Sequence, residues 1–538
     1  MRARSLATRA GRRRTAAAAV TAAALWLAAC GTPGSGPGGG SAGGPGAAPA
    51  DPGPAAAEPR HGGTLVVAVP VEPPNGFDPH KVEAAAAFEI AVNFFDTLVR
   101  ASPDGRIVPG LAEWWEVSED GRTYTFILRD NARFHNGRPV TSRDAAFSLR
   151  RILDEATGAP RRADYASIVE IETPDDRTLV LRTADYDAAL LANLANLNAA
   201  VVPEEAVDTL SNRPVGSGPF RFAAWEPGSR IILERFDDYW DGDLPYLDRV
   251  EFRFIDNPAT ALAALQAGDI HLIPRMTGSD ALMLEADPAF KVVSGPQNLV
   301  QLMAINNAAE PFDDPRVRQA ILHAVDRQAI IAGASWGFGT PIATHMTPVL
   351  PFYNPATEQV YPHDPDRARA LLREAGYEQG LEAVLTLPEP YSLHIQSGEI
   401  IAEQLEAVGI RLRLEVVEWG TWLERVYGDR QFQLTIIGHT GRLDPDALLG
   451  RYASDHGSNY FSYNNPQVDR LLVEGRRAVS FDERKRIYDE IQMLITRDAA
   501  NLFIQDPHVL AGMAAAVEGY KIYPVYVVDL RDVYLAER

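Results

Sequence analysis

Short apolar and alternating runs separated by turn residues dominate the first half of the chain. The segment 65–69 (LVVAV) is continuously apolar, as in a buried β-strand. The segment 123–128 (TYTFIL) is rich in β-branched and aromatic residues and follows an Asp-Gly turn, and 230–234 and 250–255 have the same character. The pattern predicts four β-strands.

Helical periodicity appears between these runs and towards the C-terminus. Asp314 and Pro315 provide an N-cap and a first-turn proline, and 316–327 (RVRQAILHAVDR) then carries apolar residues on one face. Further helices are predicted over 366–375, 399–408 and 482–497, and strands over 411–417 and 432–438. Strands and helices are thus mixed, and 538 residues exceed one ordinary core, so we expect an α/β protein of several domains.

Composition and charge narrow the class of partner. The chain is 46% hydrophobic, which is typical of a globular protein, and its formal net charge is −21. A balance this acidic, with no dense basic stripe beyond the first residues, argues against a nucleic-acid partner. The one cysteine, Cys30, excludes an internal disulfide and a cysteine-built metal site.

The N-terminus has the pattern of a secretory signal. Six arginines lie within residues 1–15, and the uncharged apolar run 16–29 is too short to span a membrane. The ending Leu-Ala-Ala-Cys resembles the bacterial lipobox, which implies that Cys30 is lipidated and becomes the mature N-terminus. The alternative is a signal peptide cleaved at a small-residue site, with Cys30 there by chance.

The next segment, 30–61, predicts a flexible tether. It consists almost entirely of Gly, Pro, Ala and Ser, which cannot bury a core. Removal of 1–29 changes the formal net charge from −21 to −27. The expected arrangement is a lipid anchor, a tether and an extracytoplasmic body at the cell surface or in the periplasm.

Signatures of catalysis are absent from the sequence or weak. No Walker-A or HExxH motif occurs, and the 11 histidines are scattered. One GxSxG match, centred on Ser335, follows a predicted helix instead of the buried strand that a nucleophile elbow requires. We therefore expect a binding protein without a cofactor, and keep a secreted serine hydrolase using Ser335 as the alternative.

Several ordered stretches resemble the extracytoplasmic solute-binding proteins of ABC importers, family 5, which bind oligopeptides, dipeptides or nickel. The resemblance is collinear from about residue 62 to the C-terminus. The motifs that carry it are GGTLVVA (62–68), FDP (77–79), FDTLV (95–99), PGLAEWW (109–115), DGRTYTF (120–126), FHNGRPV (134–140), VGSGPF (215–220), YW (239–240), LQAGDI (265–270) and PFDDPRVRQA (311–320).

The resemblance implies a two-lobed fold like that of the type II, cluster C periplasmic binding proteins, with an extra inserted domain. Lobe I is expected to comprise 62–100, 214–298 and 506–538. The inserted domain is expected over 101–213 and lobe II over 299–505. The lobes would close on a ligand held between them, as in other hinged binding proteins.

A loop after the strand 432–438 is expected to contact the ligand. In dipeptide and oligopeptide binders of the family, an aspartate in this loop meets the peptide ammonium group. Here Arg442 occupies that place, and a guanidinium favours a carboxylate or a phosphate. The ligand is therefore predicted to be peptide-like or opine-like with an acidic group near Arg442, or at least not a plain free-amine peptide. The alternative is that Arg442 pairs with Asp444 or Asp446 and does not touch the ligand.

Other residues fall where the family often lines its cleft. The full set of predicted ligand-binding residues is Asn75, Trp419, Trp422, His439, Thr440, Gly441, Arg442, Asp444, Gln505 and Asp506. Nickel or haem is a ligand elsewhere in the family, but the sequence contains no clustered His, Cys or Met site for either.

The function expected from the resemblance is capture of a peptide-like solute and its delivery to the permease subunits of an ABC importer. The protein would act as a monomer, attached to the membrane through Cys30. A ligand-capturing partner of a membrane sensor is an alternative that the same fold allows.

Overall fold

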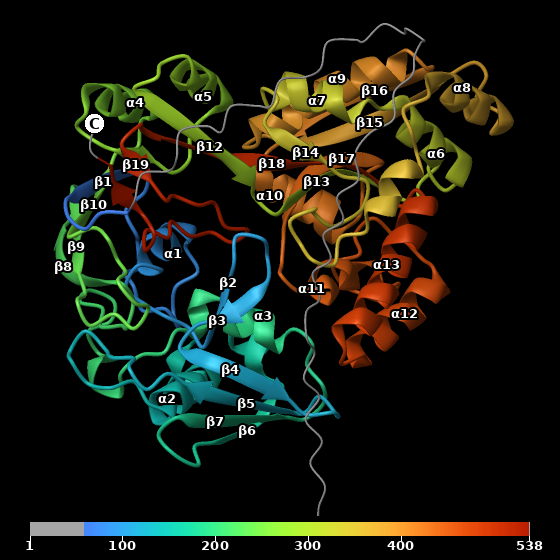
Figure 1. The fold of residues 1–538 in the computed structure, drawn as a ribbon. Helices are drawn as coiled ribbons and strands as arrows, with labels where there is room; N and C mark the ends of the chain where they lie inside the picture. The colour runs from blue at the N-terminus through green and yellow to red at the C-terminus, as the bar shows by residue number, and fades with distance from the viewer. Residues whose placement is uncertain (1–58, 537–538) are drawn as a thin grey trace, which may run out of the picture. The chain divides into compact units, whose positions relative to one another are not determined.

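The computed structural model describes residues 59–536, in which strands and helices are mixed along the chain (Figure 1). The strands are β1 (Thr64–Val69), β2 (Val99–Ala101), β3 (Ile107–Pro109), β4 (Ala112–Val117), β5 (Thr123–Leu128), β6 (Ile168–Glu172), β7 (Thr178–Thr183), β8 (Phe220–Glu226), β9 (Arg230–Arg235), β10 (Arg249–Phe254), β11 (Leu272–Ile273), β12 (Phe290–Pro296), β13 (Leu299–Ile305), β14 (Gly339–Pro341), β15 (Leu381–Pro388), β16 (Ile410–Val417), β17 (Leu434–Thr440), β18 (Asn501–Ala514), β19 (Val517–Glu518) and β20 (Tyr534–Leu535). The α-helices are α1 (Ala85–Ala91), α2 (Ser142–Leu153), α3 (Leu190–Leu194), α4 (Pro258–Ala267), α5 (Gly278–Glu285), α6 (Pro315–Ala324), α7 (Arg327–Ala334), α8 (Pro365–Glu374), α9 (Ser392–Glu406), α10 (Trp419–Trp422), α11 (Pro445–Leu449), α12 (Pro466–Arg477) and α13 (Phe481–Arg497).

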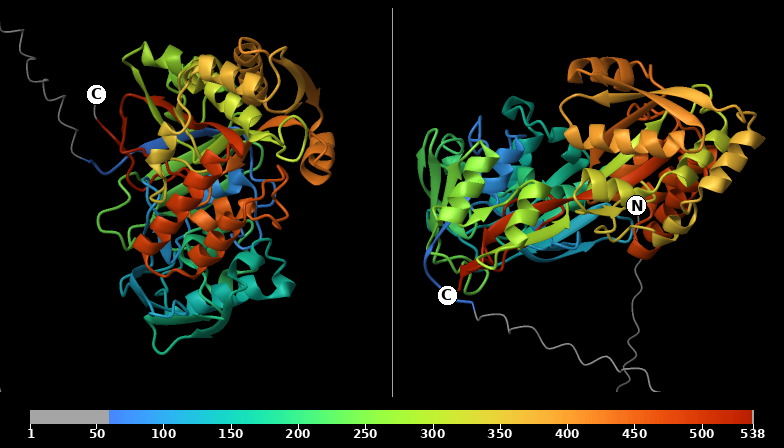
Figure 2. Two further views of the ribbon diagram at one scale, coloured as in Figure 1. Left: turned by 90° about the vertical axis from the view of Figure 1, so that its right-hand side faces the viewer. Right: turned by 90° about the horizontal axis from the view of Figure 1, so that it is seen from above.

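One long strand, β18, joins the two halves of the main sheet. The sheet runs in the order β16-β15-β17-β13-β18-β11-β1-β10-β9-β8, and β12 and β14 also pair with β18. The first residues of β18 pair with β13, and its later residues, 508–514, pair with β12. Figure 2 shows β18 passing from one half into the other.

Each half of the sheet has hydrophobic cores on both of its faces, and we call the halves lobe I (β1, β8–β12) and lobe II (β13–β17). In lobe II, alternate residues of β13 face different cores, with Leu302 in one and Met303 in the other. The core of lobe I takes in Ala200, Val202 and Leu210, although these residues fall inside the segment 101–213 expected to form the inserted domain.

A separate four-stranded sheet, β4-β5-β7-β6, forms the inserted domain together with α2 and α3. Its core also receives Phe236, Tyr239 and Trp240 from the chain after β9. The Nε1–H of Trp240 donates to the Asp96 carboxylate (2.8 Å), which links the YW motif to the FDTLV motif. The two motifs are thus partners in one buried contact.

Most predicted elements are confirmed, with three differences. The expected helix over 316–327 is two helices, because the Asp326 side chain accepts hydrogen bonds from the N–H groups of Gln328 and Ala329 and begins a second helix. Helix α9 begins at Ser392 instead of residue 399. Strand β17 extends to Thr440, because it pairs with β13 as far as Leu299.

The predicted signal peptide, Cys30 and most of the tether lie outside the described residues. Among the helices of 59–536, none is long and apolar enough to cross a membrane.

Candidate solute-binding site

A cavity of about 840 Å³ lies between lobe I, the inserted domain and lobe II. This is within the usual range for small-molecule sites, about 300–1,000 Å³. Its walls include residues of α1, of 95–101, of 161–164 and 189–198 in the inserted domain, of 438–447 in lobe II and of the C-terminal segment 523–531.

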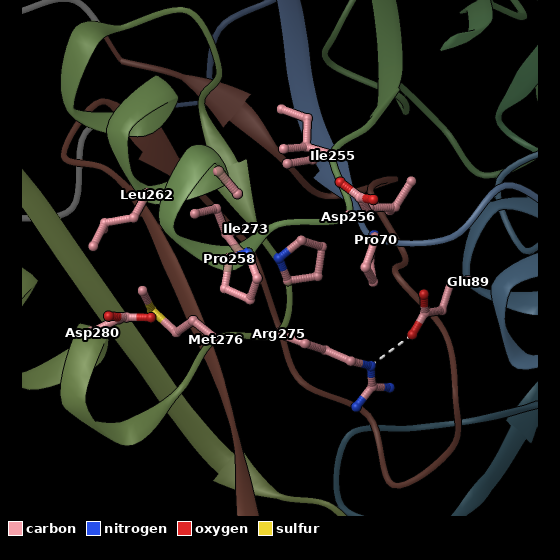
Figure 3. Close-up of a pocket in the computed structure, with 14 residues that line it drawn as sticks. Pro70, Glu89, Ile255, Asp256, Pro258, Leu262, Ile273, Arg275, Met276 and Asp280 are labelled. Carbon is pink, nitrogen blue, oxygen red and sulfur yellow. Dashed lines mark hydrogen bonds and ion pairs between the residues drawn. The ribbon is translucent and has the colours of Figure 1, made fainter. Parts of the chain in front are cut away.

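A second, much smaller cavity of about 60 Å³ lies at the ends of β1, β10 and β11 (Figure 3). Its wall contains Arg275, which donates to the Glu89 carboxylate on α1 (2.6 Å). The Arg275 guanidinium also lies 4.9 Å from the ring centre of Tyr526, a residue of the larger cavity. Arg275 thus contacts a residue of each cavity wall, and of these two cavities only the larger has room for a peptide-like solute.

Arg442 is an unpaired cation in the lobe II wall. It makes no hydrogen bond or ion pair with any residue of 59–536. Solvent reaches the side chain, yet partial burial lowers the pKa of its guanidinium, as do the charges of Arg161 and Arg451, while Asp164 acts in the opposite direction. An anionic group placed here would relieve this repulsion and gain charge-assisted hydrogen bonds.

Neither neighbouring aspartate pairs with Arg442. The buried Asp444 carboxylate accepts from Arg484 (2.9 Å) and caps α11 through the N–H of Asp446 (2.9 Å). Asp446 pairs with Arg476 (2.9 Å). The alternative in which Arg442 is neutralised within its own loop is therefore wrong.

His439 and Thr440 belong to β17, not to a loop as predicted, and His439 joins a buried hydrogen-bond chain. Its Nδ1 lies 3.2 Å from Nε2 of His345, and its Nε2 lies 3.2 Å from the Tyr460 hydroxyl. Nδ1 of His345 in turn contacts the Tyr452 hydroxyl (2.9 Å). Burial lowers the pKa of both histidines well below 6.5. Because both its nitrogens are occupied, His439 faces the cavity as a neutral ring, without a free polar atom.

The wall formed by lobe I contains two buried carboxylates, Asp96 and Asp529, beside Arg100 and Arg531. Burial raises the pKa of Asp96 to about 6 and that of Asp529 to about 7. Asp529 is paired with Arg531 (2.8 Å), whereas Oδ1 of Asp96 has no hydrogen-bond partner within the described chain. Within 59–536, the lobe II wall therefore presents the unpaired Arg442 cation, whereas Arg161 of the inserted domain is paired with Asp164 (3.3 Å) and the lobe I wall carries two buried carboxylates.

Five of the predicted residues, His439, Thr440, Gly441, Arg442 and Asp444, line this cavity. The others do not, because they are buried elsewhere or point away. Trp422 is buried in the lobe II core with its Nε1–H bonded to Thr435, and half-buried Trp419 stacks on it (5.1 Å). Asn75 is exposed in a turn, and Gln505 and Asp506 are fully buried in β18.

The GxSxG match does not form a nucleophile elbow. Ser335 ends α7, and its hydroxyl exchanges hydrogen bonds with the Gln505 side chain (3.1 and 2.8 Å). No histidine or carboxylate of residues 59–536 bonds to it, so a base that could activate the hydroxyl is missing from its contacts.

Sequence reasoning missed Arg161, Arg451 and the aromatic residues of 523–526. The two arginines stand in unremarkable sequence contexts and approach Arg442 only through the tertiary fold. The segment Tyr-Pro-Val-Tyr did offer a weak signal, since tyrosine is enriched at binding interfaces.

The chain belongs to the bacterial extracellular solute-binding proteins, family 5, whose model matches residues 106–460. It is 29% identical to the dipeptide-binding protein of Escherichia coli K12, over 84% of this chain and 91% of that one. Its fold matches that of DppA from Helicobacter pylori in complex with the peptide STSA (29% identity, TM-score 0.69, 89% and 99% of the chains). It also matches AgaA of A. tumefaciens R10 in complex with agropinic acid (30% identity, TM-score 0.67, 88% and 99%).

These findings define the class of protein. The fold is that of the type II periplasmic binding proteins, and the chain is an extracytoplasmic solute-binding protein of an ABC importer and not an enzyme.

Proposed function

We propose that the protein captures a small peptide-like or opine-like solute with an acidic group, and passes it to the permease of an ABC importer. The observation that carries the proposal is Arg442. Its guanidinium lies in the wall of the cavity of about 840 Å³, pairs with no residue of 59–536, and is repelled by the charges of Arg161 and Arg451. Two similar proteins support this ligand class: the structure of AgaA contains agropinic acid, and a relative is named as a dipeptide-binding protein.

The test is a thermal-shift panel together with mass spectrometry of any solute that co-purifies. Dipeptides with a glutamate side chain and acidic opines are expected to stabilise the protein, by about 2.7 kcal/mol at a hundredfold excess over Kd. Dipeptides with uncharged or basic side chains, which carry only the terminal carboxylate, are expected to stabilise it far less. Equal stabilisation by Ala-Ala and Ala-Glu would contradict the acidic specificity, and no stabilisation by any peptide or opine would contradict the ligand class.

We also propose that lipid on Cys30 holds the protein at the membrane, with 31–61 as the tether. The support is the position of the one cysteine directly after the apolar run 16–29. Wild-type protein is expected in the membrane fraction and the Cys30→Ser variant in the soluble fraction. Equal partitioning of the two would exclude the anchor.

A further inference from the structure

The chain passes between the two lobes at a point where one carboxylate collects three backbone hydrogen bonds. Asp506 in β18 accepts from the N–H groups of Gln297 (3.2 Å), Asn298 (3.1 Å) and Leu299 (3.0 Å). These residues connect β12 of lobe I with β13 of lobe II. The chain passes from lobe I to lobe II at 297–299, and β18 passes from lobe II back to lobe I. Asp506 therefore links these two connections between the lobes, which we call the lobe crossing.

Asp506 is an uncommon group for such a place. It is fully buried and has no cationic partner among the described residues. Burial raises its pKa to about 7, and the three N–H groups act in the opposite direction. A buried carboxylate is costly unless its oxygens are hydrogen-bonded, so its presence indicates that the three bonds matter.

Asn298, at the centre of this connection, reaches both walls of the large cavity. Its C=O accepts from the N–H of Gly441 (2.6 Å), and its Nδ2 donates to the carbonyl of Pro524 (3.3 Å). Gly441 belongs to the lobe II wall and Pro524 to the C-terminal segment. Its Oδ1 accepts from Thr347 (2.9 Å), and its φ of +59° is a conformation that asparagine tolerates better than most residues.

The approach of Gly441 to Asn298 is close enough to exclude any side chain. A Cβ on Gly441 would lie 2.1 Å from Oδ1 of Asn298 and 2.2 Å from its carbonyl oxygen. This gives a physical reason for the glycine that follows Thr440, one residue before Arg442. The ligand-facing loop is thus fitted directly against the lobe crossing.

We propose that Asp506 and Asn298 are positioning residues that set the spacing between the Gly441 and Pro524 walls of the cavity, and so transmit movement at the lobe crossing to the solute. Neither residue needs to touch the solute. The inference rests on the proposed function in one respect: it assumes that the solute binds in the large cavity.

The experiment is amide hydrogen exchange on the full chain without solute. In Asp506→Asn the amide nitrogen cannot accept a hydrogen bond, so one carboxylate acceptor is lost with little change of shape. Exchange is expected to accelerate at least tenfold at 297–299 and at 440–442, with β15 and β16 unchanged. Asn298→Gly keeps the positive φ and the backbone carbonyl that accepts from Gly441, but it removes the side-chain hydrogen bonds to Pro524 and Thr347. It serves as the second variant and is expected to accelerate exchange at 525–527.

The matched control is Asn307→Ala. Asn307 donates to the carbonyls of Ile305, Phe461 and Ala500 within lobe II and does not line the cavity. Its loss is expected to affect exchange near 305 and 500 but not at 440–442. Wild-type exchange at 440–442 in Asp506→Asn together with wild-type exchange at 525–527 in Asn298→Gly, or uniform acceleration along the chain, would overturn the proposal.

A binding arm separates this inference from the proposed function. Affinity for the dipeptide Ala-Glu is expected to fall at least fivefold in Asp506→Asn and to stay unchanged in Asn307→Ala. If Ala-Glu and the rest of the panel fail to bind wild-type protein, the proposed function fails, and the exchange experiment still decides whether the two residues couple the crossing to the wall.

Discussion

Arg484→Met is expected to destabilise the protein by about 3–5 kcal/mol, the usual cost of leaving one member of a buried ion pair without its partner. The Arg484 and Asp444 side chains are 7% and 5% exposed, and their charged atoms are 2.9 Å apart. The guanidinium also lies 5.4 Å from the ring centres of both Phe352 and Tyr488. The measurement is denaturant unfolding followed by circular dichroism, analysed for the transition that includes lobe II.

The chain offers a matched control two residues away. Asp446 pairs with Arg476 at the same distance, 2.9 Å, but the Arg476 side chain is 46% exposed. Arg476→Met is expected to cost no more than about 1 kcal/mol, because solvent screens that pair. The double variant Arg484→Met, Asp444→Asn keeps an N-cap for α11 and is expected to recover much of the loss. Similar losses for the two arginine variants would contradict the argument.

This ion pair also explains how the ligand-facing loop is held. Asp444 is held by its ion pair with Arg484, and Gly441 is held by the hydrogen bond from its N–H to the Asn298 carbonyl. Arg442 lies between Gly441 and Asp444 in the chain and has no hydrogen-bond or ion-pair partner in the part of the chain that the structure describes. The loop is therefore well positioned while its cation stays available, which is the arrangement that preorganised recognition requires.

The sequence pattern predicted secondary-structure elements correctly where turn residues and helix caps close to them in the chain determine their ends. The strand over 123–128 and the helix begun by Asp314 and Pro315 agree with β5 and α6, since turn chemistry and capping act within a few residues. The end of β17 was misplaced because pairing with β13, more than 130 residues away, extends it through His439 and Thr440. No local pattern carries that information.

The site was predicted in part for the same reason. The segment 438–444 was found because family resemblance locates it after an apolar strand, and it does line the cavity. Trp422 was expected there too, yet an indole next to a strand packs as readily into the core, and its Nε1–H finds Thr435. The positions of Arg161 and Arg451 near Arg442 could not be predicted from the sequence, because the fold brings the three residues together from separate segments.

Charge reversal at Arg442 is expected to have the largest effect on solute binding. A charge-assisted hydrogen bond contributes about 1.5–3 kcal/mol, or roughly 10- to 150-fold in affinity, and a glutamate adds repulsion to the loss. Arg442→Glu is therefore expected to weaken binding of Ala-Glu or an acidic opine by more than about 100-fold. The measurement is isothermal titration calorimetry against Ala-Glu and Ala-Ala in parallel.

The control must change the net charge equally without touching the cavity. Arg143 satisfies this, because its side chain is 78% exposed and forms only a long surface contact with Asp176 (3.5 Å). Arg143→Glu is expected to leave the affinity for Ala-Glu unchanged within a factor of two. If Arg442→Glu weakens Ala-Glu no more than Arg143→Glu does, Arg442 does not bind the acidic group. Because Arg442 pairs with no residue of 59–536, its replacement should not lower stability, so a loss of affinity would report directly on the solute.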